Sequence, residues 1–428
     1  MSRVTEKWKG ICAIISLAIA VFFTPILLSQ YLIGDDFIVP PPNSIPLPDP
    51  DLEGKLSLTD ALQYTAISND LQSYQMNMSE LSRLLWSMQG ITNEWGLRAA
   101  PSAGGTYPLE IYLYITDSIS IPLGAHRYLP VGHLLDPIPY SSAIKVVDAF
   151  TGLERSSIEN TSLLLIVTAN YSRTTERYGD RGVQYVHLET GHVLQNCLLE
   201  LASLGLATRP ATAFNSATLQ SFLNTSLVPL LALPIGLHGN TPDTGVILQT
   251  SEMTVEQTIS LRRSQREYLT GYLSGSVIEI VAGNLSLVSA FCEFDRVDVK
   301  IAARNVTDYD SGLYSYSFSG SELSLIELGD LSEDLYVAGL NQPWIRDAQA
   351  NVVLSCDQSW ALSQVSPELR WRELLYSMGM LAQTVYLKCT AMSLGTISIG
   401  AFYENLVIDV VDVSSGYLPV YIMPIGLV

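Results

Sequence analysis

Apolar and polar positions run through the same order twice along this chain. The first 54 residues hold an uncharged apolar stretch at 10–33 and then a proline-rich stretch. Beyond them, segments with helical spacing of apolar residues alternate with short apolar runs of the kind that form buried strands. Two such runs close on a similar pattern, at 233–236 and at 423–426. The pattern predicts two domains of helices and strands behind an N-terminal extension.

Shifting the sequence against itself tests whether the two domains are copies. At an offset of 188 the following pairs match: Gly191 with Gly379, Gln195 with Gln383, Leu199 with Leu387, Leu206 with Leu394, Thr208 with Thr396, Ala213 with Ala401 and Phe214 with Phe402. At the front of each copy the offset is 197, which aligns 57–70 with 254–267. Matching blocks in the same order predict a duplication, with domains at 55–240 and 251–428 joined by a linker at 241–250.

The stretch 10–33 is long enough to cross a hydrocarbon layer of about 30 Å as a helix. Trp8 and Tyr31 flank it, the tail 1–9 is basic, and acidic residues follow. We therefore expect a single-pass protein of the cell membrane, with extracytoplasmic domains held on a stiff proline-rich linker at 34–54. A cleaved signal peptide and a reversed orientation, with the domains in the cytosol, are the alternatives.

Composition and charge narrow the function classes. A hydrophobic fraction of 48% with only 15% charged residues indicates folded domains rather than disorder. The net charge of −19 argues against a nucleic-acid partner, because phosphate contacts need a basic face. His187 and His192 flank Glu189, but their spacing does not put two ligands on one helix face, so we expect no metal site.

Three arginines form a basic cluster at the start of the second copy of this acidic chain, and a serine lies among them: Arg262, Arg263, Ser264 and Arg266. Guanidinium groups donate bidentate hydrogen bonds to phosphate, and a serine hydroxyl adds another, so the cluster predicts a phosphate site. A solvated surface is the other interpretation. At the aligned positions the first copy has Thr65, Ala66, Ile67 and Asn69.

A glycine-containing loop at 101–108 belongs to the first copy alone. It contains Pro101, Ser102, Ala103, Gly104, Gly105 and Tyr107. Its small residues allow the backbone to approach a flat ligand closely, and Tyr107 is placed to cover a ring face. A plain turn before the strand at 110–114 is the alternative. Each copy thus carries the half of a site that the other lacks, which predicts one composite site.

Several motifs carry a family resemblance, at 86–92, 98–104, 107–110 and 188–192 in the first copy and at 262–266, 312–314 and 400–402 in the second. Together they resemble the nitroreductase superfamily, and within it the SagB-type dehydrogenase branch. The resemblance covers nearly everything after residue 54.

That resemblance implies an α+β fold with a mainly antiparallel sheet and packed helices in each domain. Members pair as dimers and bind FMN between subunits, so this chain resembles a fused dimer, an intrachain pseudo-dimer that can act as a monomer. It further implies that the arginine cluster holds the FMN phosphate and that the loop lines the ring. Gly400 and Ala401 would lie near the flavin, where the first copy has Thr212 and Ala213.

Azoline-oxidising relatives carry a Lys-Tyr pair at a position where this chain has Arg177 and Tyr178. Tyr178 keeps a proton to exchange, whereas arginine effectively keeps its own. With Arg98, these residues are the catalytic candidates of a flavin-dependent oxidoreductase acting on a small molecule or peptide. Its electron partner is the substrate itself or a membrane quinone. A non-catalytic binding or scaffold protein is the competing interpretation.

Overall fold

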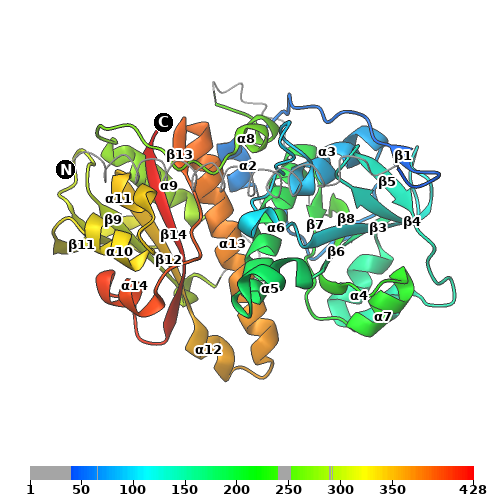
Figure 1. Cartoon of the computed structure of the whole chain (residues 1–428). Helices are drawn as coiled ribbons and strands as arrows, with labels where there is room; N and C mark the ends of the chain where they lie inside the picture. Colours follow the sequence, from blue (N-terminus) through cyan, green and yellow to red (C-terminus); the bar gives the residue numbers. More distant parts are fainter. Residues whose placement is uncertain (1–39, 65, 240–251, 289–290, 292) are drawn as a thin grey trace, which may run out of the picture. The chain divides into compact units, whose positions relative to one another are not determined.

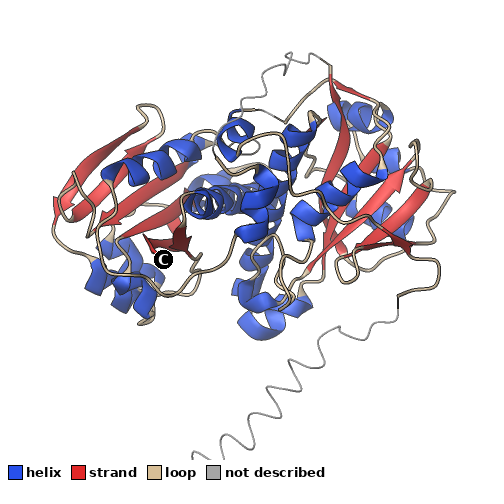
Figure 2. Cartoon of the chain, turned by 90° about the horizontal axis from the view of Figure 1, so that it is seen from above, coloured by secondary structure: helices blue, strands red, loops and turns tan. Residues whose placement is uncertain are grey.

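The computed structural model describes residues 40–64, 66–239, 252–288, 291 and 293–428. Residues from Ile45 to Val428 form one compact unit. Within this unit, two antiparallel sheets lie on either side of a central pair of long helices (Figures 1 and 2).

The first repeat contains an 8-stranded antiparallel sheet in the order β1-β5-β4-β3-β6-β8-β2, with β7 also paired to β8. Its strands are β1 (Ile45–Pro46), β2 (Leu71–Gln72), β3 (Leu109–Ile115), β4 (Gly124–Leu129), β5 (Leu134–Pro137), β6 (Leu163–Ala169), β7 (Ala207–Thr208) and β8 (Val228–His238). Its α-helices are α2 (Leu58–Gln63), α3 (Met78–Gln89), α4 (Gly152–Glu159), α5 (Ser172–Tyr178), α6 (Arg181–Leu204) and α7 (Ser216–Leu223). Short 3-10 turns occur at Ala103–Gly105 and Val146–Ala149.

The second repeat contains a 6-stranded antiparallel sheet in the order β11-β10-β9-β12-β14-β13. Its strands are β9 (Val297–Ala303), β10 (Gly312–Ser317), β11 (Glu322–Leu328), β12 (Ala350–Asp357), β13 (Leu394–Thr396) and β14 (Tyr417–Leu427). Its α-helices are α8 (Val255–Leu261), α9 (Gly275–Leu285), α10 (Ser332–Ala338), α11 (Pro343–Asp347), α12 (Gln358–Ser363), α13 (Pro367–Ala391) and α14 (Glu404–Val410). The same path, β5-β4-β3-β6-β8-β7, runs through the first sheet. The predicted fold class, two α+β repeats in tandem, is confirmed.

The repeats begin in the same way. The Ser57 hydroxyl caps α2 and the Thr254 hydroxyl caps α8, each accepting a hydrogen bond from the third backbone amide beyond it. These two caps also lie opposite each other in an antiparallel bridge. Leu58 N donates to Met253 O at 3.1 Å, and Val255 N donates to Leu56 O at 3.2 Å. The offset of 197 maps one bond onto the other, so a pseudo-twofold axis passes between them.

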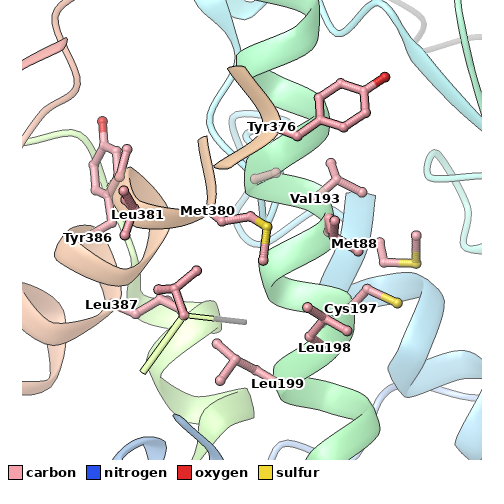
Figure 3. Packing of buried hydrophobic residues seen from close by; sticks show 14 of the residues in the cluster. Met88, Val193, Cys197, Leu198, Leu199, Tyr376, Met380, Leu381, Tyr386 and Leu387 are labelled. Carbon is pink, nitrogen blue, oxygen red and sulfur yellow. The ribbon is translucent and has the colours of Figure 1, made fainter. Parts of the chain in front are cut away.

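The same axis passes between α6 and α13, which pack against each other through their buried faces (Figure 3). Gly191 of α6 and Gly379 of α13 occupy aligned positions and meet at the crossing. A Cβ added to Gly191 would lie 2.8 Å from the Gly379 Cα and would overlap the Tyr376 carbonyl oxygen. A Cβ added to Gly379 would meet Gly191 and Leu188 in the same way. Glycine on both helices is therefore what allows the repeats to share one core.

Part of the predicted spacer belongs to the folded unit. Ile45 and Pro46 form β1, which pairs antiparallel with β5. Proline fits there because β1 lies at the edge of its sheet, where no further ladder hydrogen bond is required of it. The predicted basic tail 1–9, membrane helix 10–33 and linker 241–250 lie outside the described residues, as does the first part of the spacer, 34–39.

The predicted location in the cell membrane was wrong. Among the helices that the structure describes, none is long and apolar enough to cross a membrane. The prediction rested on residues 10–33, which the structure does not describe.

Candidate functional site

A pocket lies between the repeats and is lined by both of them. The first repeat contributes the loop from Pro101 to Gly104, Tyr178, and the α6 face that carries Tyr185, Glu189 and His192. The second repeat contributes a larger set: Ser264, Arg266, Gln342, Trp344, Tyr386, the segment from Ile397 to Ala401, and Tyr421. The pocket holds about 800 Å³ of space outside the protein atoms, including the part that is open to solvent.

The loop of the first repeat depends on the backbone of Gly104. This residue has φ 60° and ψ 17°, a left-handed conformation that favours glycine. A Cβ there would overlap the Tyr178 hydroxyl and would lie 2.8 Å from Arg177 Nη1. Arg177 Nη1 donates to the Gly104 carbonyl at 3.2 Å. The structure thus places Tyr178 in the pocket wall, whereas Arg177 holds the loop from outside the lining.

The residues of the arginine cluster fall into two groups, of which one contacts the first repeat and the other lines the pocket. Arg262 is 3% exposed, and its guanidinium donates to Ala99 O at 2.9 Å and to Arg98 O at 3.1 Å. Arg263 donates to Thr92 O at 3.0 Å. Both side chains therefore link the second repeat to the backbone of the first repeat through hydrogen bonds. Neither side chain lines the pocket.

Ser264 and Arg266 do line the pocket. The Ser264 hydroxyl lies 2.9 Å from the Tyr386 hydroxyl. Arg266 is exposed, and its guanidinium lies over the Trp344 ring, 5.7 Å from the centroid. No ion pair or hydrogen bond engages this guanidinium among the residues that the structure describes. It is the lining cation that is available to an anion.

Two other predicted site residues lie behind the loop. Arg98 Nη1 donates to Gln89 Oε1 at 2.9 Å, and its guanidinium lies 4.3 Å from the Tyr107 ring centroid. The Tyr107 hydroxyl accepts from Arg98 N at 3.1 Å. Burial lowers the pKa of Arg98 and raises the pKa of Tyr107. From the sequence we expected Tyr107 to cover the face of a bound ring. In the structure its ring stacks on the Arg98 guanidinium, and Tyr107 does not line the pocket.

The α6 face that lines the pocket follows helical spacing. Tyr185, Glu189 and His192 stand four and three residues apart, which puts them on one side of the helix. The Tyr185 hydroxyl donates to the Gly400 carbonyl at 2.9 Å, and its ring packs edge-on against Tyr178. A Cβ on Gly400 would lie 2.7 Å from the Tyr185 ring. Gly400 lines the pocket, and the ring of Tyr185 leaves no room for a side chain at this position.

His192 is buried and belongs to a chain of hydrogen bonds that crosses between the repeats. Burial lowers its pKa to about 3. The Gln383 Oε1 atom can only accept, so His192 Nδ1 carries the proton and donates to it at 2.9 Å. The Tyr421 hydroxyl donates to Nε2 at 3.3 Å. Gln383 Nε2 in turn donates to Asn196 Oδ1 at 2.7 Å. The chain fixes the imidazole in one tautomer.

Glu189 is 3% exposed, and burial raises the pKa of its carboxyl to about 7. The Ser102 hydroxyl, the Arg98 charge and the Gln89 amide act in the opposite direction. Burial outweighs them because an ionised carboxylate loses its hydration there. Near neutral pH this carboxyl therefore exists in both protonation states.

The pocket has a counterpart position, related to it by the pseudo-twofold axis, where most of these polar side chains are replaced. The offset of 188 pairs Glu189 with Ser377, His192 with Met380, Tyr386 with Leu198 and Gly400 with Thr212. In the closing strands, where 233–236 aligns with 423–426, the offset is 190 and pairs Tyr421 with Leu231. Thr212, which aligns with Gly400, has a side chain where Gly400 has none, and its hydroxyl donates to Glu373 Oε1. Asn69, which aligns with Arg266, accepts a hydrogen bond from Arg209. The chemistry of the pocket is thus confined to one of the two related positions.

Several lining residues were not assigned to the site from the sequence, namely Tyr185, Glu189, His192, Gln342, Trp344, Tyr386, Ile397, Ser398, Ile399 and Tyr421. Two signals were available for some of them. One is the helical spacing of polar residues within the apolar α6. The other is the contrast between polar and apolar residues at aligned positions, as in Tyr421 against Leu231.

Comparisons with known proteins agree with the fold. The nitroreductase family profile matches residues 72–237 and 259–427. A nitroreductase-like protein of Methanocaldococcus jannaschii is 37% identical over 194 residues, which cover 44% of this chain and 93% of that protein. The microcin B17-processing protein McbC of Escherichia coli is 21% identical over 150 residues, 34% of this chain and 55% of McbC. A solved nitroreductase-like structure from Anabaena variabilis has a TM-score of 0.70 at 24% identity and covers 89% of this chain and 94% of its own.

Proposed function

Because the chain belongs to the nitroreductase family, whose members are oxidoreductases, we propose that it is an FMN-dependent oxidoreductase with one composite flavin site. The second repeat would hold the phosphate, and the loop of the first repeat would lie along the ring. The observation that carries this proposal is the pocket between the repeats, whose polar groups are absent from the related position.

The residues of the pocket fit a flavin. Glu189 Oε1, in the pocket wall, is buried without a hydrogen-bond partner among the described residues. Buried polar atoms of this kind are costly unless a ligand or water pairs with them. Gly104 and Gly400 carry no side chain of their own, which allows Tyr178 and Tyr185 to pack closely against the backbone of the two walls. The exposed guanidinium of Arg266 adds a cation for the phosphate.

Each predicted residue then has a distinct task. Arg266 and Ser264 would contact the phosphate, while Arg262, which lies outside the pocket lining, would hold the loop backbone in position. Pro101, Ser102, Ala103, Gly104, Gly400 and Ala401 would line the ring. FMN bound there would supply a ring that accepts and donates hydride. Tyr178 faces the same space and would contact the substrate.

We place the chain in the SagB-type branch and propose a small molecule or a peptide as its substrate. Similarity to McbC and to the trifolitoxin-processing protein TfxB of Rhizobium leguminosarum supports this assignment. The chain spans only 55% of McbC and 32% of TfxB. Arg177 is bound to the loop backbone, so it would position Gly104 and leave proton transfer to other groups.

Flavin retention tests the proposal. The purified chain is mixed with FMN and freed of excess, and its visible spectrum gives the amount retained. We expect one flavin per chain. Arg266→Ala should weaken FMN binding about 10- to 100-fold, because a charge-assisted hydrogen bond is worth roughly 1.5–3 kcal/mol. Arg155→Ala, which removes an exposed arginine whose partners are Asp148 and Glu159, serves as the control.

A folded wild-type protein that retains no flavin would refute the proposal and favour a binding or scaffold role. Two flavins per chain would refute the single composite site. Equal affinity in wild type and Arg266→Ala would remove the phosphate role of Arg266.

A further inference from the structure

Among the described residues that line the pocket, Glu189 is the one with a carboxyl group. It lies on the third turn of α6, in a pocket that is also lined by the loop of the first repeat and by the second repeat. Its Oε1 atom is buried and has no hydrogen-bond partner in the part of the chain that the structure describes. A carboxyl oxygen in that condition is free to bond to whatever occupies the pocket.

We propose that Glu189 is the acid–base residue of the pocket, exchanging a proton with a nitrogen, oxygen or sulfur atom of the substrate. This inference rests on the proposed flavin-dependent function. In the oxidising direction the substrate loses a hydride from carbon to the flavin and a proton from the neighbouring heteroatom to the Glu189 carboxylate. Two electrons and two hydrogens leave the substrate in total, and the carboxyl later returns its proton to solvent.

Four other titratable groups of the lining, His192, Arg266, Tyr185 and Tyr421, are less suited to this task. Both nitrogens of His192 are engaged, and burial keeps its pKa at about 3. Arg266 does not lose its proton at accessible pH. Burial raises the pKa of Tyr185 and of Tyr421, and Tyr421 already donates its hydroxyl proton to His192.

Glu189 has both the position and the acidity for proton exchange. Its pKa of about 7 lets the carboxylate accept a proton and the carboxyl donate one near neutral pH, where acid–base catalysis is most effective. The groups that face it are Arg98 and Tyr107 from the loop side, Tyr421 from β14, Tyr185 and His192 from α6 itself, and the uncharged Gln89 from α3. Arg98 is the charged group among them at neutral pH. A titration of the pocket near neutrality is therefore assigned to Glu189.

The test measures proton uptake by Glu189 without requiring a known substrate. The flavin-loaded full chain is titrated with a chemical reductant at a series of pH values, and the midpoint potential is plotted against pH. Negative charge that arrives on reduction favours the protonated carboxyl, so the wild-type plot should change slope close to neutral pH. In Glu189→Gln, which keeps the shape of the side chain and removes the proton exchange, that change of slope should be lost.

Infrared spectroscopy of the same samples gives a second readout. The carbonyl stretching band of a protonated carboxyl should fall with rising pH in wild type, and the Glu189 part of it should be absent from Glu189→Gln. The control is Glu200→Gln, which removes another buried carboxyl that is not part of the pocket lining. It should remove its own infrared band and leave the slope change of the potential in place.

The outcomes separate the two proposals. If wild type binds flavin and its potential follows the same pH curve as that of Glu189→Gln, the role of Glu189 is refuted while the flavin site stands. If the slope change disappears from Glu200→Gln and survives in Glu189→Gln, the assignment to Glu189 is equally refuted. If the folded wild type binds no flavin, both proposals fail.

Discussion

Gly400 shows at the scale of a single residue how the pocket stays open. Alanine there would put a Cβ 2.7 Å from the ring of Tyr185, whose hydroxyl is bonded to the same residue's carbonyl. Overpacking of this kind costs about 1–3 kcal/mol. We expect Gly400→Ala to displace Tyr185 and to weaken FMN binding about 10-fold or more. Equilibrium dialysis or fluorescence quenching of FMN would measure the change.

Thr212→Ala is the matched control, because Thr212 aligns with Gly400 in the other repeat. It removes the hydroxyl that donates to Glu373 and is expected to leave FMN affinity unchanged, since Thr212 lies outside the pocket lining. Unaltered FMN binding in Gly400→Ala would show that the ring does not approach this wall.

At the scale of elements, the crossing of α6 and α13 carries the association of the repeats. Gly191→Ala would place a methyl group against the Tyr376 carbonyl and the Gly379 Cα, and backbone atoms do not yield easily. We expect the free energy of unfolding to fall by roughly 1–3 kcal/mol, more than the gain in helix propensity can offset. Because Gly379 meets the mirrored contacts, Gly379→Ala should cost a similar amount.

Urea denaturation of both variants would test this expectation. Gly283→Ala on α9 is the control, because its Cβ would meet no atom within 4 Å and alanine should instead stabilise the helix by up to about 1 kcal/mol. Variants at Gly191 and Gly379 that are as stable as Gly283→Ala would mean that the two helices can separate slightly without loss.

The elements were more predictable than the contacts between them. The offsets of 188 and 197 identified the repeats through matched blocks in the same order, and Gly191 and Gly379, one of the matched pairs, meet at the crossing of α6 and α13. The loop around Gly104 was predicted from its small residues, and Gly400 was assigned from the family resemblance. Arg262 was assigned to a phosphate, yet most of its donors bind the backbone at Arg98 and Ala99. The residues around an arginine in the sequence do not predict which distant backbone carbonyl its guanidinium will bind.

The pocket residues of the second repeat illustrate the same limit. Tyr386 lies on α13 and Tyr421 on β14, and only the tertiary fold brings both beside α6. Their aligned counterparts, Leu198 and Leu231, carry no polar group. Comparing the repeats position by position would therefore have flagged them, whereas their periodicity alone indicates ordinary core residues.

At the scale of the whole molecule, stability should depend on pH through a buried acidic cluster where the repeats join. Glu200 of α6 and Glu256 of α8 are both 0% exposed, and Arg83 of α3 pairs with each of them. One cation thus faces two carboxyls. Burial and the neighbouring Glu256 raise the pKa of Glu200 to about 8.

The sign of the effect follows from where the proton is held. Between the ordinary carboxyl pKa, about 4.5, and the raised value of about 8, the folded protein keeps a proton on Glu200 that the unfolded chain has released. The stabilising contribution is therefore fully present below the lower value and is lost as the pH rises through the upper one. In wild type the free energy of unfolding should fall from pH 5 to pH 8, and Glu200→Gln should make that slope shallower and leave the part that Glu189 contributes. Urea denaturation at intervals of pH measures it, with the exposed Glu159→Gln as the control. A slope in Glu200→Gln as steep as that of wild type would show that Glu200 does not hold the linked proton.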